Sequence, residues 1–362
     1  MSEHYHRGVA RVTLQTIADH VGVSRMTVSN AFSRPDQLSD GLRERILDAA
    51  RELGYVGPDP AARALARGTA GAVGVLLTSS LPYAFTDDVA VGFLAAVTEE
   101  LAPTGLALTL LTSSSRDGLV PARDVPLDGA LVYSCDPDAT AADWLARRGL
   151  PLVFVDQEPA DGIASVNVDD RGGARAAAQH LVDLGHRRVA VMVAGLGGEH
   201  GLVDDPAAHL TGWKRAGRER MLGYLDALGP AGVEPVVHRQ VDNSDEEARV
   251  AATALLARPD RPTGVLCYSD VIAHGVVRAA EDLGLSVPGD LALTGWDDIM
   301  AADYARLTTV HQSMRELGAT AAHWLDQRIS GTSPGVRREV LPTRLVIRTS
   351  CGPHEIQPEG QA

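Results

Sequence analysis

The sequence predicts an α/β core of two lobes, each a parallel sheet flanked by helices, preceded by a small all-α helix-turn-helix unit. Residues 12–33 have the apolar spacing of two short helices joined by a tight turn. From Ala72 onward, apolar runs of strand length alternate with helical segments, the pattern typical of βαβ units in parallel sheets. This alternation occurs in two successive series, the second of which begins after Asp169. We therefore expect two lobes of similar construction.

The helix-turn-helix is predicted within residues 12–33. Thr13 is suited to cap a first helix that begins at Leu14. Gly22 supplies a turn residue that adopts the left-handed conformation at low cost, and Ser24 can cap a second helix. Two helices of an ordinary helical core would show the same pattern, so the spacing alone leaves both interpretations open.

The outer face of the second helix carries side chains suited to the major groove of DNA. Arg25 can fork onto guanine, Asn30 can pair with adenine, and Met26 can touch a thymine methyl group. Thr27, Ser29 and the helix N-terminus can hold phosphates. This arrangement favours a DNA-binding unit.

A third helix is expected over residues 42–53, which closes a small core and completes a headpiece over 1–57. The stretch 58–70 then predicts a short hinge helix that is too short to be stable alone. In it, Leu65 with neighbouring arginines such as Arg63 could wedge into a minor groove, although a plain linker is the alternative. The candidate DNA contacts are Thr13, Leu14, Ser24, Arg25, Met26, Thr27, Ser29, Asn30, Arg63 and Leu65.

The body is predicted over residues 71–352 and is followed by a flexible tail over 353–362. Strands are expected at 73–77, 106–111, 129–133, 151–155, 188–193, 264–267, 291–294, 308–312 and 344–348. Helices are expected at 89–101, 173–184, 218–228, 244–256, 270–283 and 314–329. We assign about 71–160 and 311–331 to the first lobe, and about 161–310 and 332–352 to the second.

Ligands of parallel sheets bind at the carboxyl ends of strands, and here two such edges would face each other across a crevice. Carboxylates and arginine bind sugar hydroxyls, while aromatic rings cover the apolar side of a sugar. The candidate effector contacts are Tyr83, Phe85, Asp87, Asp156, Arg220, Ser269, Asp270, Trp296 and Asp297. Taken singly, Ser269 and Asp270 could instead be helix caps, Trp296 a core residue and Asp156 a turn residue.

The formal net charge of −14 is unevenly distributed along the chain. Residues 1–70 contain nine arginines and eight acidic residues, for a net charge of +1, which leaves −15 on the remainder. An acidic body repels DNA phosphates. Contact with DNA is therefore expected through the headpiece alone, and its affinity should fall steeply as salt rises.

Other classes of site find little support in the sequence. The cysteines Cys135, Cys267 and Cys351 lack metal or disulfide spacing and fit a reducing cytoplasm. The long segment 194–218 could form a lid or subunit contact. Its histidines and aspartates are interpreted as part of a solvated loop and not as a metal site, because they form no closed ligand set. No catalytic motif, phosphate loop, signal peptide or membrane span is recognised. We predict no enzyme activity, no cofactor, no metal and no membrane association, and a cytoplasmic location.

The motifs Val12-Thr13-Leu14, Ile17-Ala18, Gly22-Val23-Ser24 and Thr27-Val28-Ser29 resemble the N-terminal domain of the LacI family of bacterial transcription regulators. The resemblance extends from Val12 to Arg348, and the family core is similar in fold to periplasmic sugar-binding proteins. It implies that the residues at the positions of Arg25, Met26 and Asn30 meet base edges. It also implies that Leu65 wedges between bases and that Arg220 and Asp297 contact the effector.

Two features depart from the family pattern. An arginine is frequent where Asn30 stands, so the operator sequence does not carry over. Residues 57–60, Gly-Pro-Asp-Pro, replace a more usual proline-asparagine and add one residue before Leu65.

The resemblance implies a homodimer that binds a pseudo-palindromic double-stranded DNA operator, most simply as a repressor, and is controlled by a small-molecule effector, expected to be a sugar. The tail has no leucine heptads, so we expect no tetramer built by the tail. The alternative function is a solute-binding protein of the periplasmic sugar-binding type, which has the same lobes but no DNA-binding unit.

Overall fold

The computed structural model divides the chain into two units, Met1–Gly71 and Ala72–Ala362. The residues it describes are 12–55, 57, 64, 67–77, 81–113, 118–134, 140–194, 200–207, 210, 213–304 and 306–352. The predicted hinge contacts Arg63 and Leu65, and the predicted tail 353–362, lie outside these residues.

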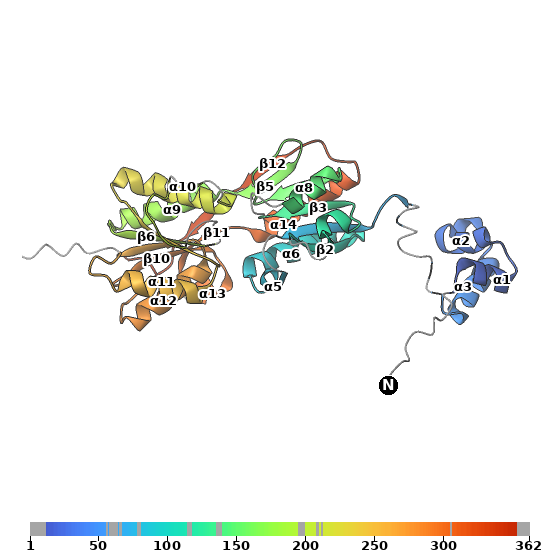
Figure 1. Ribbon diagram of the computed structural model, residues 1–362, viewed down its shortest axis with the longest axis horizontal. Helices are drawn as coiled ribbons and strands as arrows, with labels where there is room; N and C mark the ends of the chain where they lie inside the picture. The colour runs from blue at the N-terminus through green and yellow to red at the C-terminus, as the bar shows by residue number, and fades with distance from the viewer. Residues whose placement is uncertain are drawn as a thin grey trace, which may run out of the picture. The chain divides into compact units, whose positions relative to one another are not determined.

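The first unit is a bundle of three helices, which matches the predicted headpiece (Figure 1). They are α1 (Leu14–Val21), α2 (Arg25–Ser33) and α3 (Asp40–Glu52), with a 3-10 turn η1 (Pro35–Gln37) between the last two. One apolar face of each helix packs into a common core of Ile17, Ala18, Val28, Ala31, Ile46, Ala49 and Ala50. Because several of these side chains are small, the helices can pack closely without a large core.

The first lobe of the second unit is built on a six-stranded sheet in which every neighbouring pair is parallel. Its order is β12-β5-β4-β3-β1-β2. The strands are β1 (Ala72–Leu77), β2 (Ala107–Thr112), β3 (Gly129–Tyr133), β4 (Leu152–Val155), β5 (Ala164–Val168) and β12 (Arg338–Leu341). Its helices are α5 (Leu81–Ala84), α6 (Asp88–Leu101), α7 (Pro121–Asp124), α8 (Thr140–Arg147) and α14 (Met314–Ile329), with the 3-10 turn η2 (Ala102–Thr104).

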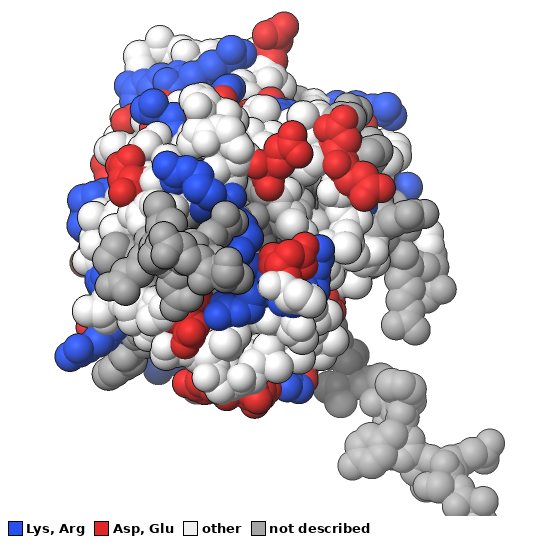
Figure 2. Space-filling view, turned by 90° about the vertical axis from the view of Figure 1, so that its left-hand side faces the viewer, with Lys and Arg blue, Asp and Glu red and all other residues white. Residues whose placement is uncertain are grey.

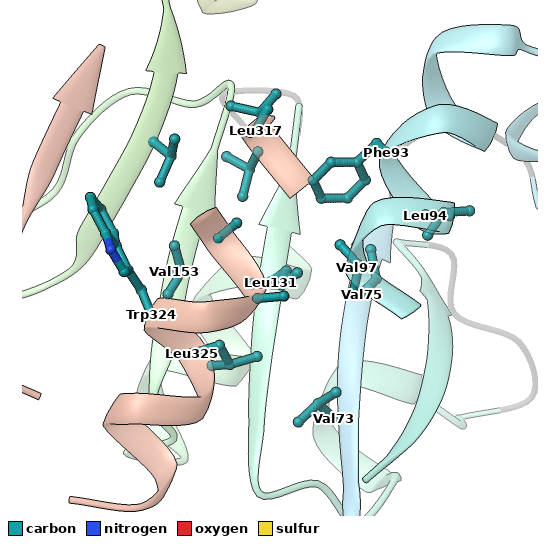
Figure 3. Packing of buried hydrophobic residues seen from close by; sticks show 14 of the residues in the cluster. Val73, Val75, Phe93, Leu94, Val97, Leu131, Val153, Leu317, Trp324 and Leu325 are labelled. Atoms are coloured by element: carbon teal, nitrogen blue, oxygen red, sulfur yellow. The ribbon is translucent and has the colours of Figure 1, made fainter. Parts of the chain in front are cut away.

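Helices α6 and α14 share one face of this sheet and bury its main core (Figure 3). Val97 of α6 lies next to Val75 of β1, and Phe93 of α6 and Leu325 of α14 belong to the same core (Figure 3). Helices α7 and α8 bury a smaller cluster that includes Leu111 and Leu145 on the other face. The sheet is therefore buried on both sides, as expected for parallel strands.

The second lobe contains a seven-stranded sheet of order β13-β11-β10-β9-β6-β8-β7. Its strands are β6 (Val189–Ala194), β7 (Gly201–Val203), β8 (Val236–Gln240), β9 (Gly264–Cys267), β10 (Ala292–Asp297), β11 (Thr308–His311) and β13 (Arg344–Val346). The two edge strands β7 and β13 pair antiparallel and the others parallel. Its helices are α9 (Asp170–Asp183), α10 (Arg215–Leu228), α11 (Asp245–Leu256), α12 (Asp270–Asp282) and α13 (Met300–Tyr304), with the 3-10 turn η3 (Gly229–Ala231).

The helices of this lobe form two pairs that bury opposite faces of the sheet. Helix α9 packs on α10 over one cluster, and α11 packs on α12 over another. On the face shown in Figure 2, acidic and basic side chains are interspersed over the surface. This face therefore has no large region of a single sign.

The predicted lobe boundaries were wrong at two places. We assigned residues 161–168 and 332–341 to the second lobe, but they contain β5 and β12, which pair with each other at the edge of the first sheet. The chain crosses between the lobes three times, after β5, after β11 and after β12. The sequence did not predict strands β5, β7, β8 and β12. The strands that it did predict are present, with ends shifted by no more than a few residues.

Candidate functional site

The turn between α1 and α2 has the geometry that the sequence predicts. The Thr13 hydroxyl accepts a hydrogen bond from the backbone N–H of Thr16, at 3.3 Å, and thereby caps α1. Gly22 has a φ of 77°, and its N–H donates to the carbonyl of Ala18 at 2.9 Å. The Ser24 hydroxyl accepts from the N–H of Thr27 at 3.0 Å, which caps α2. These contacts fix where α2 begins.

Helix α2 presents polar and apolar side chains on the face opposite its buried residues, Val28 and Ala31. Met26 is 69% exposed and Arg25 is also exposed, while Ser29 is half-buried on the same face. Leu14 and Thr27 are half-buried, and Leu14 packs against the headpiece core. A long side chain at Arg25 or Met26 is thus available to reach into a groove.

Asn30 is engaged within the headpiece. Its side-chain Nδ2 donates to Oε1 of Gln37 at 3.2 Å, and the residue is half-buried. Pairing with adenine, as predicted for this side chain, uses Oδ1 and one N–H of the amide, and the bond to Gln37 occupies the other N–H. Gln37 therefore sets the orientation of the Asn30 amide in the structure described here.

The second unit contains a cavity of about 620 Å³ between its two lobes. The first lobe contributes the ends of β1, β3 and β4, and the second lobe contributes α10, the loop after β8 and the ends of β9 and β10. The lining residues are Leu77, Ala84, Asp87, Val89, Ala90, Tyr133, Ser134, Asp156, Val168, Ala194, Lys214, Arg220, Val241, Asp242, Asn243, Ser244, Tyr268, Ser269, Asp297, Gln312, Met314 and Leu317. This volume and its mixed polar and apolar wall suit a small organic molecule.

Arg220 is the most deeply placed cation of the cavity wall, with 4% of its surface exposed. Its Nε donates to Oδ1 of Asp170 at 2.9 Å, and its Nη1 donates to the carbonyl of Tyr268 at 2.8 Å. Arg215 pairs with the other oxygen of Asp170 at 3.0 Å. Burial raises the pKa of Asp170 to about 6 against the effect of Arg220. The paired guanidinium groups keep this carboxylate ionised at neutral pH.

Trp296 does not line the cavity, which corrects the prediction that its ring covers a ligand. The side chain is 0% exposed and packs in the core beneath α9 and α10. The guanidinium carbon of Arg220 lies 4.0 Å from the centre of the ring. Trp296 therefore supports Arg220, and the alternative of a core residue was the correct one.

Two aspartates of the wall have positive φ at the ends of strands. Asp156, directly after β4, has a φ of 50°, and Asp297, the last residue of β10, has a φ of 111°. Such backbone conformations are costly for residues other than glycine and are found preferentially at functional sites. Both carboxylates line the cavity, as their predicted positions at strand ends required.

The Asp297 carboxyl is held by the crossover between the lobes. Oδ1 of Asp297 accepts a hydrogen bond from Nε2 of Gln312 at 2.5 Å. Burial raises the pKa of Asp297 well above its ordinary value against the effect of Arg220, and Asp270 and Asp87 raise it further. Gln312 lies directly after β11, in one of the three segments that join the lobes. A ligand that bonds to Asp297 therefore acts next to a hinge.

Ser269 and Asp270 have structural partners. The Ser269 hydroxyl accepts from the N–H of Ile272 and donates to Oδ1 of Asn243 at 2.5 Å, so it caps α12 and anchors the loop after β8 at the cavity wall. Asp270 is 3% exposed and does not line the cavity. Its oxygens accept from the hydroxyl of Thr309 and from a backbone N–H. The prediction that Asp270 contacts effector is corrected, because it joins α12 to β11 instead.

A glycine makes room for this buried carboxylate. A Cβ atom at Gly295 would lie 2.1 Å from Oδ1 of Asp270. Gly295 in β10 is therefore required for Asp270 to reach Thr309.

The predicted cluster after the first strand is only partly at the cavity. Asp87 lines it and caps α6 by accepting from the N–H of Ala90 at 2.8 Å. Phe85 is 64% exposed and lies outside the cavity lining, so its predicted contact is not made in this structure. The side chain of Tyr83 lies outside the described residues.

Several lining residues were not predicted from the sequence, namely Tyr133, Lys214, Asn243, Tyr268 and Gln312. Tyr133 and Tyr268 stand at or after strand ends, next to residues that were predicted, so the same rule would have found them. Asn243 follows β8, which the sequence did not predict. Lys214 and Gln312 lie in connecting segments without a recognisable pattern.

The long segment 194–218 includes the edge strand β7. Within it, β7 pairs antiparallel with β8, and Trp213 is buried against the second-lobe core. In the described residues of the chain, no helix is long and apolar enough to cross a membrane. No three His, Cys, Asp or Glu side chains of the described ranges are grouped to hold a metal ion.

Two family models match the chain. Residues 13–57 match the bacterial regulatory proteins of the lacI family, and residues 178–351 match a periplasmic binding protein-like domain. The match over residues 13–57 coincides with the three-helix unit. The match over residues 178–351 covers most of the second lobe and the last part of the first lobe.

Whole-length relatives have the same organisation. The HTH-type transcriptional regulator IpsA of Corynebacterium glutamicum is 37% identical, over 94% of this chain and 96% of its own length. The HTH-type transcriptional regulator CelR of Thermobifida fusca is 31% identical, over 94% of this chain and 98% of its own.

Solved structures agree with these relatives in fold. A LacI-family regulator from Corynebacterium glutamicum superposes with a TM-score of 0.70 at 32% identity, covering 96% of this chain and 99% of that one. The lac repressor dimer bound to operator and an anti-inducer superposes with a TM-score of 0.73 at 26% identity, covering 94% of this chain and 98% of that one. A solute-binding protein without a DNA-binding unit is thereby set aside, as is an enzyme. The chain belongs to the LacI family of bacterial transcription regulators.

Proposed function

We propose that this chain is a homodimeric repressor that binds a pseudo-palindromic operator through α2 and is controlled by a sugar held between its lobes. A relative, CelR, has been solved as a complex with cellobiose, with a TM-score of 0.66 at 29% identity. The observation that carries the proposal is the cavity itself, because both lobes contribute its polar wall. Because it acts on DNA, we place the protein in the cytoplasm.

The proposed mechanism is linkage between two binding equilibria. A ligand that touches Asp87 and Asp156 in one lobe and Arg220 and Asp297 in the other stabilises one arrangement of the lobes over another. If that arrangement holds the two headpieces of a dimer at a spacing that does not match the operator, ligand and operator weaken each other by the same factor. Residues 58–70 are proposed to form the hinge helix that transmits the change.

The experiment starts with selection of an operator from random duplex DNA, using the full chain. Fluorescence anisotropy with the selected duplex then measures affinity at several salt concentrations, with and without candidate sugars such as cellobiose or ribose. The proposal expects a steep fall of affinity with salt and a further loss with one sugar. Failure to select any duplex would overturn the DNA-binding role, and operator affinity that no bound ligand changes would overturn the control.

A further inference from the structure

Carboxyl groups outnumber cations in the wall of the cavity. Asp87, Asp156, Asp242 and Asp297 line it, against only Arg220 and Lys214 among the described residues. The charge of Arg220 is already met by Asp170, at 2.9 Å, and Lys214 is also engaged within the protein. Both cations of the wall thus already have partners within the protein.

Asp156 is a carboxylate of the cavity wall with one unsatisfied oxygen. Its Oδ1 is shielded from solvent and accepts no hydrogen bond from the described residues. No ion pair of the described chain includes it either. Its position is fixed, because its backbone N–H donates to the carbonyl of Val166 at 3.1 Å while φ stays at 50°. A buried acceptor left without a donor is unfavourable, so a donor brought by a ligand relieves a cost that the free protein bears.

We propose that the cavity selects an uncharged polyhydroxylated ligand and rejects its phosphorylated or carboxylated counterparts, with Asp156 as the residue that sets this preference. The inference rests on the proposed function, namely that this cavity holds the effector. Hydroxyl groups donate to carboxylates, and each carboxylate of the wall can accept more than one such bond. A phosphate placed among the same groups meets like charges at short range in a poorly solvated site, where repulsion is strong.

The first test compares matched ligands on the full chain by thermal shift and titration calorimetry. The probes are ribose with ribose 5-phosphate, glucose with glucose 6-phosphate and gluconate, and cellobiose with cellobionate. We expect each anionic member to bind at least tenfold more weakly than its uncharged parent. An anionic member that binds as tightly as its parent would overturn the inference, and so would a panel in which only anionic members bind.

The second test changes the charge at Asp156 and does not depend on knowing the ligand. Asp156→Asn removes a charge whose shielded Oδ1 accepts no hydrogen bond, so the melting temperature of the free protein should rise. Asp161→Asn, an exposed carboxylate of the same lobe, is the matched control and should leave it unchanged. An unchanged or lowered melting temperature for Asp156→Asn would mean that the carboxylate is compensated, and the inference would be wrong.

For any matched set of the panel in which a ligand binds, Asp156→Asn should also reduce the ratio of the affinities for the uncharged and anionic members at least tenfold. A ratio as large as in the unmodified chain would count against Asp156. The outcomes separate this inference from the proposed function. An uncharged ligand that binds without changing operator affinity contradicts only the proposed function. A phosphorylated ligand that binds tightly and releases the operator contradicts only this inference.

Discussion

The guanidinium carbon of Arg220 lies 4.0 Å from the centre of the Trp296 ring, and Trp296 has no exposed surface. The cation that faces the cavity thus lies against the core of the second lobe. Because the ring helps to hold the guanidinium group in place, this contact couples the core of the lobe to the cavity wall.

Trp296→Ala should lower the free energy of unfolding by about 3–5 kcal/mol, since it removes a large, fully buried side chain. Trp296→Phe keeps an aromatic ring and should cost much less. Urea denaturation followed by far-ultraviolet circular dichroism measures both. If the alanine variant were as stable as the unmodified chain, Trp296 would not be the core residue described here.

Arg220→Ala should abolish the response to effector while leaving operator affinity intact, because Arg220 lies in the cavity wall and not in the headpiece. It should also lower stability by about 3–5 kcal/mol, because it leaves Asp170 with one cation instead of two. Adding Asp170→Asn should recover part of that loss. Anisotropy with the selected operator and denaturation measure the two effects, and an unchanged response to ligand would remove Arg220 from the site.

The stability of the protein should depend on pH through Asp270. Burial raises the pKa of this carboxyl to about 7 in the folded state, from 3.8. The folded protein therefore binds a proton at Asp270 more tightly than the unfolded chain does. The stability that this proton contributes is present below about pH 4 and is lost as pH rises to about 7. The asparagine in Asp270→Asn does not titrate. The free energy of unfolding of this variant, relative to that of the unmodified chain, should therefore rise by about 2–3 kcal/mol between pH 5 and 8. Parallel curves of stability against pH for the two proteins would contradict this.

Arg25→Ala should weaken binding to the selected operator by about 10- to 100-fold, the loss expected for one arginine that pairs with guanine. Its effect on random duplex should be much smaller. Arg51→Ala, at an exposed position of α3, is the control and should change neither. Equal losses for Arg25→Ala on both duplexes would show that Arg25 binds only phosphates.

Leu65→Ala should lower affinity for the operator far more than affinity for random DNA. The prediction follows from the proposed hinge, in which an apolar side chain enters the minor groove and bends the duplex. Circular-permutation gel shifts measure the bend, and anisotropy measures the affinities. Equal loss on both duplexes, with the bend retained, would refute the role of a wedge.

The sequence predicted the headpiece well because its signals are local. The caps Thr13 and Ser24 and the turn residue Gly22 act within four residues of their own position, so the sequence alone is enough to place them. The engagement of Asn30 by Gln37 could not be predicted in this way, because it depends on the path of the chain after α2.

The lobe boundaries and part of the cavity could not be derived from the sequence. Paired residues of β5 and β12 are 173 residues apart in the chain, as with Ser165 opposite Arg338, and nothing in either segment identifies its partner. Trp296 stands at a strand end, where the pattern predicts a ligand contact, but the ring points away from the cavity into the core. Which face a strand-end residue occupies is decided by the packing of α9 and α10, which the local sequence does not encode.

The separation of β12 and α14 from the rest of the first lobe has a consequence for synthesis. The ribosome makes β1 to β5 first, then the whole of the second lobe as far as β11, and only afterwards α14 and β12. Until α14, which ends at Ile329, has emerged, the α14-facing side of the early strands and of α6 is uncovered. The apolar side chains of Phe93, Val97 and Leu131 are then open to solvent or to a chaperone. A release or pause of translation before α14 would therefore leave a second lobe that lacks β13, attached to an aggregation-prone first one.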